Sequence, residues 1–155
     1  MWSGSELGIP LTTSVKNPGP FSMQQLTWAQ FDAAVASLTL RLRSSSFSGV
    51  YGVPRGGLCL AVALSHSLQI TQLMNPQPGC LIVDDVYETG QTLHPLYAIW
   101  PDAVFAVWIS KSPPEWWIAA EVFTSQEWVV FPWAQLHHAI SDEQDYRTSR
   151  GMRAE

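Results

Sequence analysis

An acidic pair followed by a short loop of threonines and a glycine is the part of this sequence best suited to chemistry. Asp84 and Asp85 directly follow the apolar run 80–83, and the loop 88–92, Glu-Thr-Gly-Gln-Thr, begins after two further residues. Carboxylates can hold the hydroxyls of a diol, and such a loop offers backbone N–H groups, hydroxyls and a flexible glycine to an anion. A ligand with both a phosphate and a vicinal diol, such as a ribose 5-phosphate, would satisfy both parts.

The pattern around this motif predicts the elements that position it. Residues 80–83 have the length and branching of a strand buried on both faces, as in a parallel sheet. The acids then fall at the carboxyl end of the strand, where open α/β sheets bind ligands, and a helix from about Leu93 would direct its positive dipole end at the anion. One alternative is a generic strand that ends in a solvated acidic turn. A P-loop is poorly supported, because no Gly-Lys-Ser/Thr follows.

Length and composition indicate one globular domain. The chain has 155 residues, of which 46% are hydrophobic and 14% charged, enough to bury a core. A formal net charge of -5 argues against a broad nucleic-acid surface, so a phosphate site must be local. No run approaches the ~20 apolar residues of a membrane span, and the N-terminus does not resemble a secretory signal. We therefore expect a cytoplasmic protein with no membrane partner, in which Cys59 and Cys80 are buried thiols.

Helical spacing and turn residues divide the chain into alternating strands and helices. Apolar residues repeat at helical spacing from Thr27, a suitable N-cap, to the serine cluster 44–46. The further expected elements are strands 49–53, 70–74 and 103–110, a helix 58–68, and apolar segments 117–123 and 127–133. The alternation predicts an α/β fold with an open, mainly parallel sheet flanked by helices. Residues 1–25 are expected to form an irregular N-terminal extension, 26–134 the domain, and 135–155 a polar C-terminal tail or a terminal helix.

A second glycine-containing turn lies one strand and one helix before the acidic pair. Its residues are Pro54, Arg55, Gly56 and Gly57. Glycines let the backbone approach phosphate oxygens, and an arginine adds charge there. Alone, such a segment is often only a turn, but its position before the acidic strand favours an anion-binding loop.

These segments together resemble the type I phosphoribosyltransferases. The apolar run, the two acids and the loop ending in Thr-Gly-x-Thr are similar to the family's motif for phosphoribosyl diphosphate (PRPP), and residues 54–57 are similar to its pyrophosphate loop. Lys111 at a strand end, an aromatic strand and the segment 128–133 resemble the bacterial xanthine-guanine phosphoribosyltransferases. The resemblance covers about residues 26–133 and is distant outside the motifs.

The resemblance implies transfer of the 5-phosphoribosyl group of PRPP to a 6-oxopurine (guanine, xanthine or hypoxanthine), with release of pyrophosphate. Asp85 would approach a magnesium ion, Asp84 would hold the ribose diol or waters of the ion, and Glu88 would assist proton transfer near the purine N7. The 5-phosphate would be bound by Thr89, Gly90, Gln91 and Thr92. Members of the family commonly form oligomers, and this chain has eight tryptophans, so we expect a homodimer or a homotetramer.

The resemblance also assigns a base pocket. Lys111 would hydrogen-bond the purine 6-oxo group, Trp128 would stack on the ring, and the backbone of Val129 would face the 2-position. A flat heteroaromatic ring needs an aromatic face and a donor at its oxygen, which these residues can supply. The alternative is that Trp128 and Trp133 are core or interface aromatics and Lys111 is solvated.

Two departures from the family pattern leave other functions open. Glu88 is one methylene longer than the aspartate of close relatives, and the short link 69–79 replaces their long mobile hood. We expect residues 1–23 to fold over the site instead. The alternatives are a PRPP- or nucleotide-binding regulatory protein with little catalysis, and a phosphoribosyltransferase for another base.

The remaining ionisable residues suggest little chemistry. The four histidines lack the spacing of a metal site, so solvated or packing roles are expected. Asp142, Glu143 and Asp145 are interpreted as a solvated face.

Overall fold

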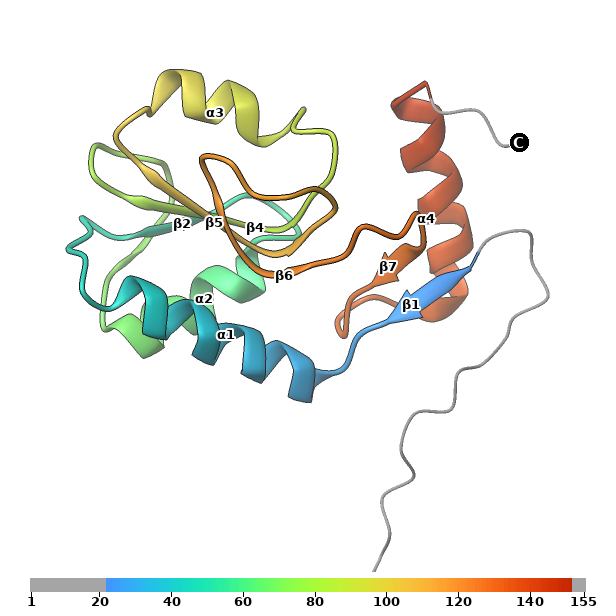
Figure 1. Cartoon of the computed structure of the whole chain (residues 1–155), viewed down its shortest axis with the longest axis horizontal. Helices are drawn as coiled ribbons and strands as arrows, with labels where there is room; N and C mark the ends of the chain where they lie inside the picture. The colour runs from blue at the N-terminus through green and yellow to red at the C-terminus, as the bar shows by residue number, and fades with distance from the viewer. Residues whose placement is uncertain (1–21, 152–155) are drawn as a thin grey trace, which may run out of the picture.

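The computed structural model describes residues 22–151 of the chain (Figure 1). The helices are α1 (Trp28–Leu42), α2 (Leu58–Leu68), α3 (Leu93–Ile99) and α4 (Leu136–Ser149). The strands are β1 (Met23–Gln25), β2 (Val50–Gly52), β3 (Gln72–Leu73), β4 (Leu81–Tyr87), β5 (Val104–Ser110), β6 (Ile118–Val122) and β7 (Trp128–Val130). In this part of the chain no helix is long and apolar enough to cross a membrane.

A five-stranded parallel sheet forms the centre of the domain. Its strand order is β3-β2-β4-β5-β6, and every neighbouring pair is parallel. Alternate residues of β4 point to opposite faces: Leu81 and Val83 pack in the core with α1 and α2, whereas Ile82 packs with Leu93 of α3. Figure 1 shows α3 on one side of the sheet and α1 and α2 on the other. The prediction of an open parallel α/β sheet is confirmed.

Helix α1 begins where its sequence predicts. The Thr27 hydroxyl accepts a hydrogen bond from the Gln30 backbone N–H, and the Gln30 side chain accepts one from the Thr27 N–H, which forms a capping box. One face of the helix is buried, with Phe31 6% and Leu38 0% exposed. The following helix, α2, has the expected bounds.

Strand β4 is longer than the sequence indicated. We expected it to end at Val83, but it continues through Asp84 and Asp85 to Tyr87, because β5 pairs with it as far as the pair Tyr87 and Ser110. On the other edge, β2 ends at Gly52, opposite Val83. Beyond Val83 one edge of β4 therefore faces the loop 54–57 instead of a strand.

A separate two-stranded parallel sheet joins distant parts of the chain. Strand β1 pairs with β7, so that Met23 lies opposite Trp128. Residues 23–25, expected to be irregular, are thus a strand because β7 supplies a partner that the local sequence does not reveal. Residues 1–21 lie outside the described residues, and so does the expected cover of the site by the N-terminal stretch.

The C-terminal region contains a helix, which was one of the two alternatives for it. Helix α4 contacts β7, and its Ala139 and Glu143 are buried. The interpretation of Glu143 as part of a solvated face is wrong: it is 1% exposed and pairs with Arg147 one turn later, at 2.8 Å. Asp142 and Asp145 are exposed, as expected.

The link between α2 and β4 is short. It contains only β3, which adds to the edge of the sheet beside β2. No hood-like insertion lies between these elements, in agreement with the shortened hood expected from the sequence.

Candidate functional site

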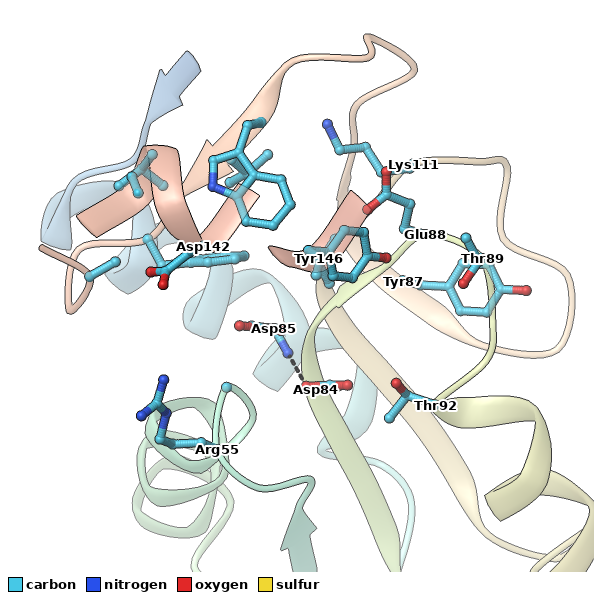
Figure 2. Close-up of a pocket in the computed structure, with 18 of the residues that line it drawn as sticks. Arg55, Asp84, Asp85, Tyr87, Glu88, Thr89, Thr92, Lys111, Asp142 and Tyr146 are labelled. Atoms are coloured by element: carbon cyan, nitrogen blue, oxygen red, sulfur yellow. Dashed lines mark hydrogen bonds between the residues drawn. The ribbon is translucent and has the colours of Figure 1, made fainter. Parts of the chain in front are cut away.

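A cavity of about 1100 Å³ opens at the carboxyl ends of the central strands. All the candidate site residues line it except Gly57, which is the buried last residue of the loop 54–57. Figure 2 shows Arg55, Asp84, Asp85, Glu88 and Lys111 around the same space, although they lie at the ends of three different strands, β2, β4 and β5. Such edges are where open α/β sheets bind ligands.

The acidic pair lies deep in this cavity. Asp84 is 7% exposed, and its carboxylate accepts a hydrogen bond from the Asp85 backbone N–H at 2.9 Å. Burial and the neighbouring Asp85 carboxylate raise the pKa of Asp84 to about 8, and burial also raises the pKa of Asp85. The two carboxylates therefore hold a proton near neutral pH unless a cation or hydroxyl donors stabilise their charge.

Carboxylate oxygens suit a hard divalent cation such as Mg²⁺. The described residues contain no group of three or more His, Cys, Asp or Glu side chains that could hold a metal ion. The donor set thus fits an ion that takes most of its ligands from substrate oxygens and water, which is how Mg²⁺ commonly binds in phosphate sites.

The loop 54–57 packs directly against the acidic pair. A Cβ atom at Gly56 would overlap the Asp85 carboxylate, and one at Gly57 would lie 2.5 Å from the Val83 carbonyl oxygen. Any larger residue at Gly56 would displace the loop or the carboxylate. Arg55 on this loop is exposed and lines the cavity, so its charge is available to an anion beside Asp85.

The loop 88–92 offers unpaired amides. Among the described residues, the backbone N–H groups of Glu88, Thr89, Gly90 and Thr92 donate to no protein acceptor, and that of Gln91 makes only a 3.5 Å contact with the Thr89 hydroxyl. Orphan amides at the mouth of a cavity are suited to an anion. The loop thus has the free donors that a phosphate requires.

Gly90 allows the loop to turn tightly against its support. Its φ is 78°, and a Cβ atom there would overlap the His94 ring and lie 2.7 Å from the Tyr87 hydroxyl. The Tyr87 hydroxyl and His94 Nε2 are hydrogen-bonded at 3.0 Å. His94 therefore has a packing role, one of the two that the sequence suggested.

Lys111 directly follows β5 and lines the cavity. Its Nζ donates to the carbonyl oxygens of Ser125 at 3.1 Å and Glu127 at 2.5 Å, which fixes the segment before β7. Burial lowers the pKa of Lys111, while the Glu88 and Glu127 carboxylates act in the opposite direction. Lys111 is therefore held in place and partly desolvated, not freely solvated.

The two tryptophans of the segment 128–133 have different environments. Trp128 lines the cavity and is half-buried, with its ring against Tyr146 at 5.3 Å between centroids. Trp133 also lines the cavity, but it packs against the core and stacks on Phe131 with ring planes 3° apart. The Val129 side chain is 7% exposed in the same core. The core interpretation thus fits Trp133 but not Trp128.

Sequence reasoning missed the contribution of α4. Tyr146, Arg147 and Arg150 line the cavity. Arg150 donates a hydrogen bond to the Gln91 side chain in the loop 88–92, and Arg147 Nη2 contacts the Gln126 carbonyl oxygen at 3.5 Å. A tyrosine and two arginines at one helix end were the only sequence signal, and nothing local linked them to the loop.

Known proteins resemble this chain in sequence and in structure. The xanthine-guanine phosphoribosyltransferase of Cereibacter sphaeroides is 25% identical over 141 residues, covering 70% of this chain and 84% of the relative. The protein of the same name from Gluconobacter oxydans is 27% identical over 153 residues, covering 78% and 90%. The crystal structure of a purine phosphoribosyltransferase from Pyrococcus horikoshii has a TM-score of 0.61 and 28% identity, covering 72% of this chain and 94% of that chain.

No protein-family model matches the chain. The similarity nevertheless spans most of this chain and most of each relative. The chain is therefore similar in sequence and in fold to purine and xanthine-guanine phosphoribosyltransferases.

Proposed function

We propose that this protein transfers the 5-phosphoribosyl group of PRPP to a 6-oxopurine and releases pyrophosphate. The observation that carries the proposal is the convergence on one cavity of an acidic pair, a loop with free amides, and the pair Lys111 and Trp128. The acidic pair and the loop suit the hydroxyls and the phosphate of a ribose phosphate. Lys111 and Trp128 suit a flat ring that carries an oxygen acceptor. The names of the relatives support the same chemistry.

The transfer replaces one bond at C1 of the ribose by another. A purine nitrogen forms a bond to C1 as the bond from C1 to the pyrophosphate oxygen breaks, and the proton of the base passes from N7 to Glu88. The loop 88–92 holds the 5-phosphate, and Arg55 with the amides of the loop 54–57 receives the negative charge of the leaving group. Lys111 and Trp128 orient the base, so most of the rate enhancement comes from positioning and electrostatics.

Magnesium is the proposed cofactor, held at Asp85 with Asp84 beside it, and when bound it would neutralise the charge of the pyrophosphate. Asp84 and Asp85 contribute oxygens near the ribose hydroxyls, where ionised carboxylates also favour the positive charge that builds on the sugar. A homodimer or homotetramer in the cytoplasm stays a prediction from the sequence.

Incubation with PRPP, Mg²⁺ and a panel of bases tests this function directly. Nucleotide and pyrophosphate should both appear with guanine, xanthine or hypoxanthine, and Asp85→Asn should abolish both products. Product from a different base alone would contradict the purine assignment. PRPP binding with no product from any base would instead support the regulatory alternative, which is favoured by the direct contact of Tyr146 with Trp128.

A further inference from the structure

The ring of Trp128, the proposed stacking partner of the base, is in contact with a residue of the same chain, Tyr146. The Trp128 and Tyr146 rings are in contact, with centroids 5.3 Å apart and planes inclined by 54°. A base inserted between two rings would separate them by roughly 7 Å, twice the contact distance of carbon atoms. A purine therefore cannot enter between these two rings as they stand.

Tyr146 also interacts with Glu88, the residue proposed to accept the proton of the base. Its phenol interacts with the side chains of Glu88 and Thr89, and the pKa of Tyr146 is raised by burial first and by the Glu88 carboxylate second. Figure 2 shows Tyr146 in the middle of the cavity beside Glu88. An aromatic ring on Trp128 with a polar atom at Glu88 is the arrangement expected of a bound base.

We propose that Tyr146 occupies the base subsite before substrate binds, so that purine entry requires this ring to leave the face of Trp128. The inference rests on the proposed function, because it takes Trp128 and Glu88 as the base-binding residues. In this proposal the end of α4 controls access to the site. The link between α2 and β4 is too short to cover it.

The contacts of α4 show which part can move. Its middle is fixed by Ala139 and Glu143, which are 2% and 1% exposed. Its end is held by Arg150, which donates to the Gln91 side chain and lies over the Tyr146 ring at 5.1 Å. The proposal therefore requires only a change in the last turn or in the Tyr146 rotamer, and neither requires the buried middle of the helix to shift.

Stopped-flow measurement of base binding to the full-length protein tests the proposal, with guanine and hypoxanthine as probes and tryptophan fluorescence as the signal. Tyr146→Ala should raise the association rate and the affinity about tenfold or more. Tyr146→Phe keeps the ring on Trp128 but loses the hydroxyl, so a smaller gain is expected. Thr148→Ala, an exposed position in the same turn that does not line the cavity, is the matched control and should behave as wild type.

The outcomes separate this proposal from the proposed function. If wild type forms nucleotide but Tyr146→Ala binds base more weakly or no faster, Tyr146 is a supporting wall and the proposal is overturned. If neither wild type nor any variant binds a base or forms nucleotide, the purine function itself fails, and this inference fails with it. Circular-dichroism melting of each variant shows whether the fold is intact. If Tyr146→Ala does not fold, Tyr146→Phe decides the test: the proposal then requires that this variant bind base faster than wild type.

Discussion

At the acidic pair, two carboxyl groups lie side by side where water would solvate their charges poorly. The pKa of Asp84 is raised to about 8 by burial and by Asp85. This arrangement opposes folding of the ligand-free protein. Residues at binding sites often lower stability in this way.

Asp84→Asn should therefore stabilise the ligand-free protein while it abolishes PRPP binding. The amide is neutral at every pH, so it removes the cost of protonating Asp84 or of burying its charge, and its oxygen can still accept a hydrogen bond from the Asp85 N–H. The expected gain in the free energy of unfolding is on the order of 1–2 kcal/mol, measured by denaturant titration at pH 7.5. Asp32→Asn on the exposed face of α1 is the control for the change in net charge. A lower stability for Asp84→Asn would contradict the account.

The ammonium of Lys111 should set the alkaline limit of base binding. Its pKa is lowered by burial from the ordinary 10.5, so it loses its proton, and one of its donors, as pH rises through a value below 10.5. The Michaelis constant for the base should then increase at alkaline pH. Lys111→Arg retains its charge over this range and should move the increase to higher pH for the same base. Identical profiles for the two proteins would exclude Lys111 as the titrating group.

Among the elements, the loop 88–92 depends on a glycine for its shape. Gly90 combines a positive φ with close contact to His94 and Tyr87, whereas Gly79, with φ 70°, has nothing within 4 Å of an added Cβ atom. A substitution at Gly79 would introduce backbone strain alone, whereas one at Gly90 would introduce both backbone strain and steric overlap. They therefore form a matched pair for mutation.

Gly79→Ala should cost only the strain of a left-handed residue, roughly 1 kcal/mol of stability, with normal PRPP affinity. Gly90→Ala should displace the loop from the His94 ring and reduce PRPP affinity at least tenfold, because the free amides lose their arrangement. Isothermal titration calorimetry with PRPP and Mg²⁺ measures the effect. Equal affinities for the two variants would show that the tight packing at Gly90 does not shape the phosphate loop.

Elements with strong local signals could be predicted from sequence, and those set by distant pairing could not. Helices α1 and α2 lie where the capping threonine and the apolar run 58–68 indicate. The predicted end of β4 was wrong, because pairing with β5, and not local composition, extends the strand to Tyr87. The strand β1 and the burial of Glu143 were missed for the same reason, since each depends on residues far away in the fold.

The candidate site shows the same division. Parallel strands bring their carboxyl ends to one edge, so the convergence of Asp84, Arg55 and Lys111 follows from the predicted topology. The contribution of α4 depends on how a polar helix packs across the cavity. No hydrophobic period in residues 136–149 reveals this packing, since only Ala139 and Glu143 are buried.

For the whole molecule, the short link 69–79 leaves the cavity without a covering segment between α2 and β4. Water then reaches the C1 centre more easily than under a closed hood. We expect slow release of pyrophosphate from PRPP without base, and more pyrophosphate than nucleotide when base is limiting. A coupled pyrophosphate assay beside chromatography of nucleotide measures the ratio, and Asp85→Asn should eliminate both signals. A strict one-to-one ratio would mean that another segment, such as residues 1–23, excludes water.

The pairing of β1 with β7 also constrains the order in which parts of the chain can fold. Ser22 and Glu127, 105 residues apart, are hydrogen-bonded beside this pair, whereas β2, β4 and β5 all lie within the shorter stretch 50–110. Closing long loops is slow and costs chain entropy, so local strands associate first. During synthesis β1 has no partner until most of the chain has emerged. The part that carries the loops 54–57 and 88–92 can therefore form early, and the strand that carries Trp128 is added in one of the last steps of folding.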